Sequence, residues 1–150
     1  MKLWQKDNSS VNELIEKFTV GRDKEFDLLL AQYDVQGSIA HVKMLKEVGL
    51  MNEQDAVDAV RGLEDILKEV LTGKFAIEEG IEDVHSQVEY LLTRRIGEAG
   101  KKIHSGRSRN DQVAVDLKLY LRAEVLAIKD EVKELFDLLI SQSEKFKDKL

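Results

Sequence analysis

The segment that most constrains this chain is residues 107–150, which contain neither glycine nor proline. From residue 121 onward, its apolar residues recur at alternating intervals of four and three, at Leu121, Val125, Ile128, Val132, Leu135 and Leu139. The alternation passes over the polar Gln142 and resumes at Phe146 and Leu150. This spacing predicts one helix of about 60 Å with an apolar stripe typical of helical bundles. A single helix cannot bury such a stripe, so we expect its partners in other subunits or in further sequence.

The first hundred residues are predicted to form shorter helices separated by glycine. An apolar run extends to Gly49 and is interrupted at Gly37-Ser38, which leaves open one kinked helix or two. Asn52 is a candidate cap for the next helix, which ends near Gly73. Residues 73–82 are predicted to be a loop, and a further helix follows. We therefore predict an all-α fold, with an N-terminal helical domain over residues 1–106 that leads into the first long helix of a central bundle over residues 107–150.

Composition excludes several classes of protein. The 43% hydrophobic content of the 150 residues argues against disorder, and the absence of cysteine excludes disulfides, Cys-ligated zinc and a thiol nucleophile. No signal peptide is recognised, and no apolar run approaches the roughly 18 residues that span a membrane. We therefore expect a cytoplasmic protein without a membrane partner. The net charge of −6 also argues against nucleic acid as a partner.

One basic segment stands out in this acidic chain, residues 101–112. Its first ten residues hold four positive charges, one histidine and no acid. Because it lies where the long helix begins, free backbone N–H groups could join Ser108, Arg109 and Asn110 to form an anion receptor. The alternative is a solvated basic loop that merely caps the helix, and composition leaves both readings open.

Two further segments carry candidate polar residues. His85 and Glu89 stand four residues apart, so on a helix the carboxylate could orient the imidazole as a proton carrier. The alternative is an ordinary polar pair beside an apolar stripe. Gly37-Ser38 predicts close packing of another backbone, and His41 is predicted to lie at a helix surface.

The motif Ser-Gly-Arg-Ser-Arg-Asn-Asp-Gln at 105–112 closely resembles the hallmark of the argininosuccinate lyases. Three other segments are similar to the family in order and spacing: Leu3-Trp4, the Asp-Val-Gln-Gly-Ser run at 34–38 and the Glu-Asp-Val-His run at 82–85. The resemblance covers nearly the whole chain. The motif at 105–112 is the specific one, and the others corroborate it.

This resemblance implies the aspartase/fumarase superfamily, whose members are all-helical homotetramers with each active site built from three subunits. It implies β-elimination of argininosuccinate to arginine and fumarate, in arginine biosynthesis, without metal or organic cofactor. Ser108, Arg109 and Asn110 would hold the substrate carboxylates, with His85 in the same region. Fixed donors there would stabilise the negative charge that builds up when the neighbouring proton is removed.

The chain also departs from the family pattern. The family's opening Leu-Trp-Gly-Gly-Arg-Phe is Leu3-Trp4-Gln5-Lys6 here, and its substrate-contacting serine has no clear counterpart. Thr19, Arg22 and Asp23 are the candidates for that contact. The family's proton-transfer segments, Thr-His-x-Gln and Gly-Ser-Ser-x-Met-Pro, do not occur in these 150 residues, so this segment is expected to hold no catalytic acid or base.

Two other functions remain compatible with the same scaffold. One is a structural protein like the lens crystallins that resemble these lyases. The other is a different fumarate-releasing lyase of the superfamily, such as an adenylosuccinate or fumarate-type enzyme. The Arg-Ser-Arg-Asn-Asp run at 107–111 argues against the latter.

Overall fold

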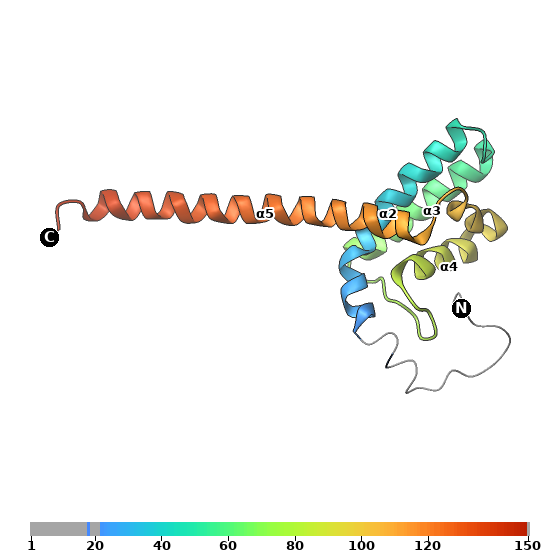
Figure 1. The fold of residues 1–150 in the computed structure, drawn as a ribbon, viewed down its shortest axis with the longest axis horizontal. Coiled ribbons are helices and arrows are strands. Elements are labelled where there is room, and N and C mark those ends of the chain that lie inside the picture. The colour runs from blue at the N-terminus through green and yellow to red at the C-terminus, as the bar shows by residue number, and fades with distance from the viewer. Residues whose placement is uncertain (1–17, 19–21, 150) are drawn as a thin grey trace. The chain divides into compact units, whose positions relative to one another are not determined.

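The computed structural model describes residues 18 and 22–149, and these residues form helices and loops without a strand. The elements are α2 (Asp23–Glu47), α3 (Glu53–Leu71), α4 (Val84–Ile96), the 3₁₀ segment η1 (Gly97–His104) and α5 (Arg109–Phe146) (Figure 1). The predicted all-α class is confirmed. The Leu3-Trp4 pair and Thr19 lie outside the described residues.

The chain divides into two compact units, Met1–Leu117 and Lys118–Leu150. The first unit holds α2, α3, α4, η1 and the beginning of α5, and the second holds the remainder of α5. The boundary predicted between residues 106 and 107 stays a prediction.

Local sequence signals account for most helix ends in the first unit. The Asn52 side chain accepts a hydrogen bond from the Asp55 N–H at 2.8 Å, so the predicted cap of α3 is confirmed. Asp83 caps α4 in the same way through the Ser86 N–H at 2.7 Å. Gly49, two residues beyond α2, has a φ of 75°, a left-handed conformation that glycine adopts without strain.

Helix α2 runs unbroken through Gly37 and Ser38, which resolves the alternative between one helix and two. Ser38 is fully buried. A Cβ atom added at Gly37 would lie 3.4 Å from Val115 Cγ1 and 3.6 Å from Asp116 Oδ1, so the start of α5 packs against this point of α2. The prediction that another backbone approaches the Gly-Ser pair is wrong at Gly37, where the neighbouring atoms belong to side chains of α5.

The core of the first unit lies between α2, α3 and α4, which all pack on one another. Its largest fully buried apolar side chains are Val35, Val42, Leu45, Leu63, Ile66, Val84, Val88 and Leu92. Fully burying each such side chain contributes about 1.5–3 kcal/mol relative to exposure. The same packing holds the first turn of α4 beside the middle of α2.

The segment η1 is pressed directly onto the backbone of α4. A Cβ atom at Gly100 would lie only 2.7 Å from the Cα and N atoms of Thr93, so no other residue fits there without a backbone shift. Ile103 on the same segment is buried in the core. The loop that follows η1 and leads to α5 is therefore tied to α4.

The long glycine-free segment forms a single helix, as predicted, although its observed bounds are Arg109–Phe146 rather than 107–150. The helix begins after Ser108 because Ser108 caps it: the Asp111 N–H donates to Ser108 Oγ at 3.3 Å. Within the second unit, the predicted stripe residues from Leu121 to Leu139 are each more than half exposed. No helix among the described residues is long and apolar enough to cross a membrane.

We expect the chain to self-associate through this stripe, because a row of exposed apolar side chains gains free energy on burial. Leu135→Glu should weaken association about tenfold or more, because it removes about 1.5–3 kcal/mol of burial and adds a charge. Sedimentation equilibrium measures the effect. Ser141→Glu is the matched control, since Ser141 is exposed, lies off the stripe and gains the same charge. A wild-type chain that stays monomeric and melts cooperatively would contradict the prediction.

Candidate functional site

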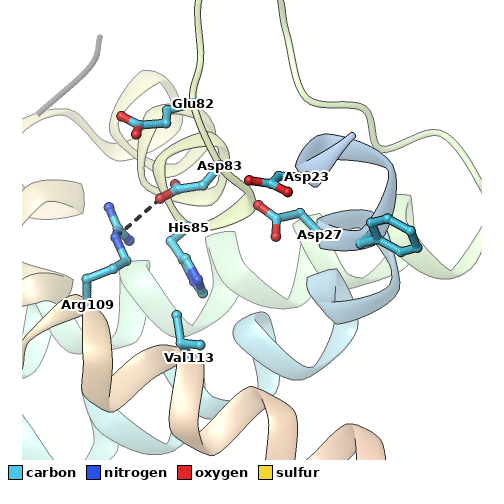
Figure 2. A pocket seen from close by; sticks show the side chains of 8 residues that line it. Asp23, Asp27, Glu82, Asp83, His85, Arg109 and Val113 are labelled. Carbon is cyan, nitrogen blue, oxygen red and sulfur yellow. Dashed lines mark ion pairs between the residues drawn. The ribbon is translucent and has the colours of Figure 1, made fainter. Parts of the chain in front are cut away.

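A pocket of about 310 Å³ opens in the first unit, where the first turns of α2, α4 and α5 meet (Figure 2). Four of its lining residues are carboxylates, one is an arginine and one a histidine: Asp23, Asp27, Glu82, Asp83, Arg109 and His85, with Phe26 and Val113 completing the wall. The lining thus offers groups of both charge signs. Two predicted site residues, His85 and Arg109, line the pocket together.

His85 lies in the first turn of α4 and is 4% exposed. Its Nδ1 is 2.9 Å from Oδ1 of Asp34 on α2 and 3.6 Å from Oδ2 of Asp116 on α5. The interpretation that Glu89 orients this imidazole is wrong. Asp34 takes that position because the packing of α4 on α2 brings its buried carboxylate against the ring.

The three buried groups form a tightly coupled charge cluster. Burial by itself would lower the pKa of His85, but the hydrogen bond and the negative charge of Asp34 outweigh it, so the pKa of His85 is raised. Burial, followed by the charge of Asp34, raises the pKa of Asp116 to about 7. Among the described residues, Oδ2 of Asp34 and Oδ2 of Asp116 have no hydrogen-bond partner. Asp116 therefore keeps its proton at pH values at which an exposed carboxyl group has released it.

Arg109, the first residue of α5, is fixed by side chains of α4 and α5. Its guanidinium donates to Gln112 Oε1 at 3.1 Å and to Ser86 Oγ at 3.3 Å. Its Nε lies 3.5 Å from Oδ2 of Asp83, which is an ion pair longer than a good hydrogen bond (Figure 2). These contacts hold the guanidinium at the pocket wall, beside His85.

The other predicted binding residues lie outside this lining. Ser108 and Asn110 are exposed, and the Ser108 N–H donates to Asp111 Oδ2 at 2.8 Å, which completes a reciprocal cap with Asp111. Backbone and side-chain hydrogen bonds from Ser108 lower the pKa of Asp111. Of the three candidates for the family's N-terminal serine contact, Asp23 lines the pocket, whereas Arg22 is exposed and pairs with Glu25.

The basic segment sorts into two kinds of residue. Lys101 pairs with Glu98 and Lys102 with Asp55, and both lysines are exposed. Arg107 instead points inward, and its guanidinium donates to Ser38 Oγ at 3.0 Å. Burial lowers the pKa of Arg107, opposed by the charges of Asp34 and Asp116. The solvated-loop reading thus describes the lysines, and the half-buried arginines face the interior and the pocket.

Two side chains, those of His41 and Asp27, make contacts that spacing along the chain does not indicate. His41 Nε2 lies 2.8 Å from the Ser105 carbonyl oxygen, so this histidine joins α2 to the basic segment. Burial, followed by the charges of Arg107 and His104, outweighs this hydrogen bond and lowers the pKa of His41. Asp27 accepts a hydrogen bond from the Val84 N–H at 3.2 Å and so holds the N-terminus of α4. Burial raises the pKa of Asp27.

Asp27 and Asp116 are site residues that the sequence reasoning missed. Asp27 precedes Asp34 by two helical turns, and Asp116 follows Arg109 by the same interval. Residues two turns apart share a helix face, so this spacing is the signal that would have found them. The ligand atoms of Asp34, His85 and Asp116 lie within 4.8 Å of one another, as a metal site requires. However, a metal-binding imidazole nitrogen must lose its proton, and the raised pKa of His85 opposes that loss, so these three groups are less suited to a metal ion than a neutral histidine would be.

A family model and the curated relatives of this chain both point to lyases. The model of a family described as lyase matches residues 7–150. The argininosuccinate lyase of Phocaeicola vulgatus is 56% identical over 99% of this chain and 33% of its own length. Those of Bacteroides fragilis and Neisseria meningitidis are 54% and 44% identical, over 99% and 91% of this chain and 33% and 30% of their own lengths. The chain spans about a third of the length of the curated relatives it matches.

The raised pKa of Asp116 predicts a loss of stability with rising pH. Folding raises this pKa from 3.8 to about 7, so the folded state binds the proton more tightly and the free energy of unfolding falls as pH rises between those values. The full effect is up to about 4 kcal/mol. Asp116→Asn, which is neutral at every pH, should flatten the decline. Urea unfolding followed by circular dichroism at pH 5 and 8 measures it.

His85 contributes a decline of its own, because a raised histidine pKa stabilises the fold below pH 6.5 and the stabilisation is lost above it. The comparison must therefore be between variants. Asp130→Asn, at an exposed carboxylate of α5, is the matched control and should keep the wild-type slope. Equal pH dependence in wild type and Asp116→Asn would contradict the prediction.

Proposed function

The chain belongs to the lyase family, and we propose that it forms the N-terminal third of an argininosuccinate lyase. In this proposal the complete enzyme splits argininosuccinate into arginine and fumarate by β-elimination. The present segment supplies groups that bind the substrate carboxylates, and the acid and base come from sequence outside these 150 residues. The proposal rests first on the identity with argininosuccinate lyases over 99% of the chain.

The observation in the structure that supports this proposal is the shared pocket of Arg109 and His85. Argininosuccinate carries carboxylates together with cationic guanidinium and ammonium groups. A lining with both Arg109 and acidic residues such as Asp27 and Asp83 suits such a molecule better than it suits a simple anion or cation. An arginine fork grips a carboxylate through two parallel hydrogen bonds.

A guanidinium bound to a substrate carboxylate would also speed the elimination. Removing the proton next to a carboxylate pushes negative charge onto that carboxylate, so a fixed guanidinium binds the transition state more tightly than the ground state. Arg109 is suited to this role because Gln112, Ser86 and Asp83 already hold it, so little reorganisation is needed. Ser108 and Asn110 are proposed to complete the carboxylate site together with residues of other subunits.

We further propose a homotetramer whose active sites are shared between subunits, working in the cytoplasm without a metal or organic cofactor. The exposed stripe of α5 supports assembly through helix packing. Ser108 and Asn110 are exposed in this single chain, as expected for residues that meet a ligand or another subunit.

Arg109→Lys in the complete lyase should lower kcat/KM about 30- to 1000-fold, the loss of roughly 2–4 kcal/mol from a charge-assisted grip. Lysine keeps the charge but loses the planar fork, so kcat should fall along with any rise in KM. Steady-state kinetics with argininosuccinate measure the effect, after circular dichroism has confirmed folding.

Two controls separate a specific site from a diffuse basic surface. Arg61→Lys makes the same chemical change at an exposed position of α3, and Lys101→Ala removes a surface charge that pairs with Glu98. Both should stay near wild type. Near wild-type kcat/KM in Arg109→Lys, or equal damage in either control, would remove Arg109 from the site.

The 150-residue chain alone should show no elimination activity, because no residue in it matches the family's acid or base. Mixing it with a complete lyase that is defective only at Asn110 should restore activity if subunits exchange, since intact sites would then draw Asn110 from this chain. The release of fumarate is followed by its ultraviolet absorbance. Activity of the purified chain alone, free of host enzyme, would refute the division of roles.

A further inference from the structure

We propose that Asp34 is a positioning residue: it accepts the Nδ1–H of His85, fixes the ring, and so presents Nε2–H to the pocket as a donor to an anionic group of the ligand. That this anion is a substrate carboxylate rests on the proposed lyase function. The way in which Asp34 holds His85 does not depend on the proposed lyase function.

The geometry gives the two ring nitrogens different surroundings. Nδ1 lies 2.9 Å from Oδ1 of Asp34, which is 1% exposed and lies in the middle of α2. Nε2 makes no hydrogen bond with the residues that the structure describes, and the ring lines the pocket. Because a neutral imidazole has one N–H and an imidazolium has two, a protonated His85 bound to Asp34 by Nδ1 keeps a second N–H for a ligand.

The cluster is built to hold Asp34 itself in place. Gln112 on α5 donates its side-chain N–H to the same Oδ1 of Asp34 at 3.3 Å, and Gln112 in turn accepts from Arg109. One chain of hydrogen bonds therefore joins Arg109, Gln112, Asp34 and His85. Both proposed donors to the ligand anion thus depend on contacts that meet at the Asp34 carboxylate.

The charges around His85 favour its protonated form. The charged groups that surround it come from every element packed against it: Asp27 and Asp34 from α2, Asp83 before α4, Arg109 and Asp116 from α5, and Arg107, which interacts with Asp34 and Asp116. Burial and Arg109 lower the pKa of His85, but the hydrogen bond and charges of Asp34 and Asp83 outweigh them, and the pKa is raised. A simple packing role for Asp34 would not require a raised pKa of His85.

The first test uses the wild-type chain and does not depend on activity. The chain has three histidines, and long-range ¹H–¹⁵N spectra of ¹⁵N-histidine-labelled chain report the protonation of each ring nitrogen. We expect His85 to carry a proton on Nδ1 at pH 7.5 and to titrate at higher pH than His41, whose pKa is lowered. Titration of His85 below His41, or an unprotonated Nδ1, would overturn the proposal.

The second test is Asp34→Asn, which keeps an oxygen acceptor and removes the charge. The pKa of His85 should fall by about one unit or more while His41 is unchanged, and Asp130→Asn should change neither. In the complete lyase, KM of Asp34→Asn should rise about tenfold at pH 8 and return toward wild type at pH 6, where the imidazole is protonated again. A loss that is the same at both pH values would mean a structural role only and would overturn the proposal.

The outcomes separate the two proposals. If the complete lyase does not act on argininosuccinate, the proposed function fails, and the spectra still decide whether Asp34 holds His85 protonated. If the lyase is active but His85 titrates as an ordinary exposed histidine, the proposed function stands and the role of Asp34 fails. If Asp34→Asn does not fold, as its melt would show, the wild-type titration decides the proposal.

Discussion

The hydrogen bond between Asp34 and His85 is the interaction on which the architecture of the site depends. It is fully buried and joins α2 to α4, and the carboxyl group of Asp116 brings α5 to the same point. A buried charge without a partner costs several kcal/mol, so the three elements can pack only in an arrangement that keeps these groups together. The apolar core drives association of the helices, and the charge cluster adds a free-energy cost to any arrangement that separates its members.

The carboxylates of the first unit fall into two groups that differ in what balances their negative charge. Asp34 and Asp116 are inside and are balanced by His85 and Arg107. Asp23, Asp27, Glu82 and Asp83 line the pocket, where water or a ligand can balance them. Arg109 and His85 stand at the boundary between the groups. A ligand anion that binds there would meet the guanidinium of Arg109, whereas the acidic residues of the lining would oppose it unless the ligand also carries positive charge.

Local sequence patterns, such as apolar spacing and capping residues, predict the helices well. They do not predict contacts between residues far apart in the sequence. The stripe of α5 and the Asn52 cap depend on residues within a few positions of each other, so spacing alone indicates them. Spacing favours Glu89 as the partner of His85 because Glu89 is a neighbour on the same helix, whereas the true partner, Asp34, is 51 residues away and meets the ring only after α2 and α4 pack. Family resemblance places Arg109 and His85 in one region because related sequences share a packed fold. Periodicity describes only neighbours along one helix and carries no information on how helices pack.

The glycine at position 100 has a mechanical consequence for the site. Because its missing Cβ lets η1 rest against the backbone of Thr93, α4 and the segment leading into α5 have no flexible layer of side chains between them at this point. His85 is carried by α4, and Arg109 begins the helix that follows that segment. His85 and Arg109 are thus carried by parts of the chain that are joined through a direct backbone contact at Gly100. A ligand that binds both side chains therefore meets groups whose supporting segments touch directly, with no layer of mobile side chains between them at this point.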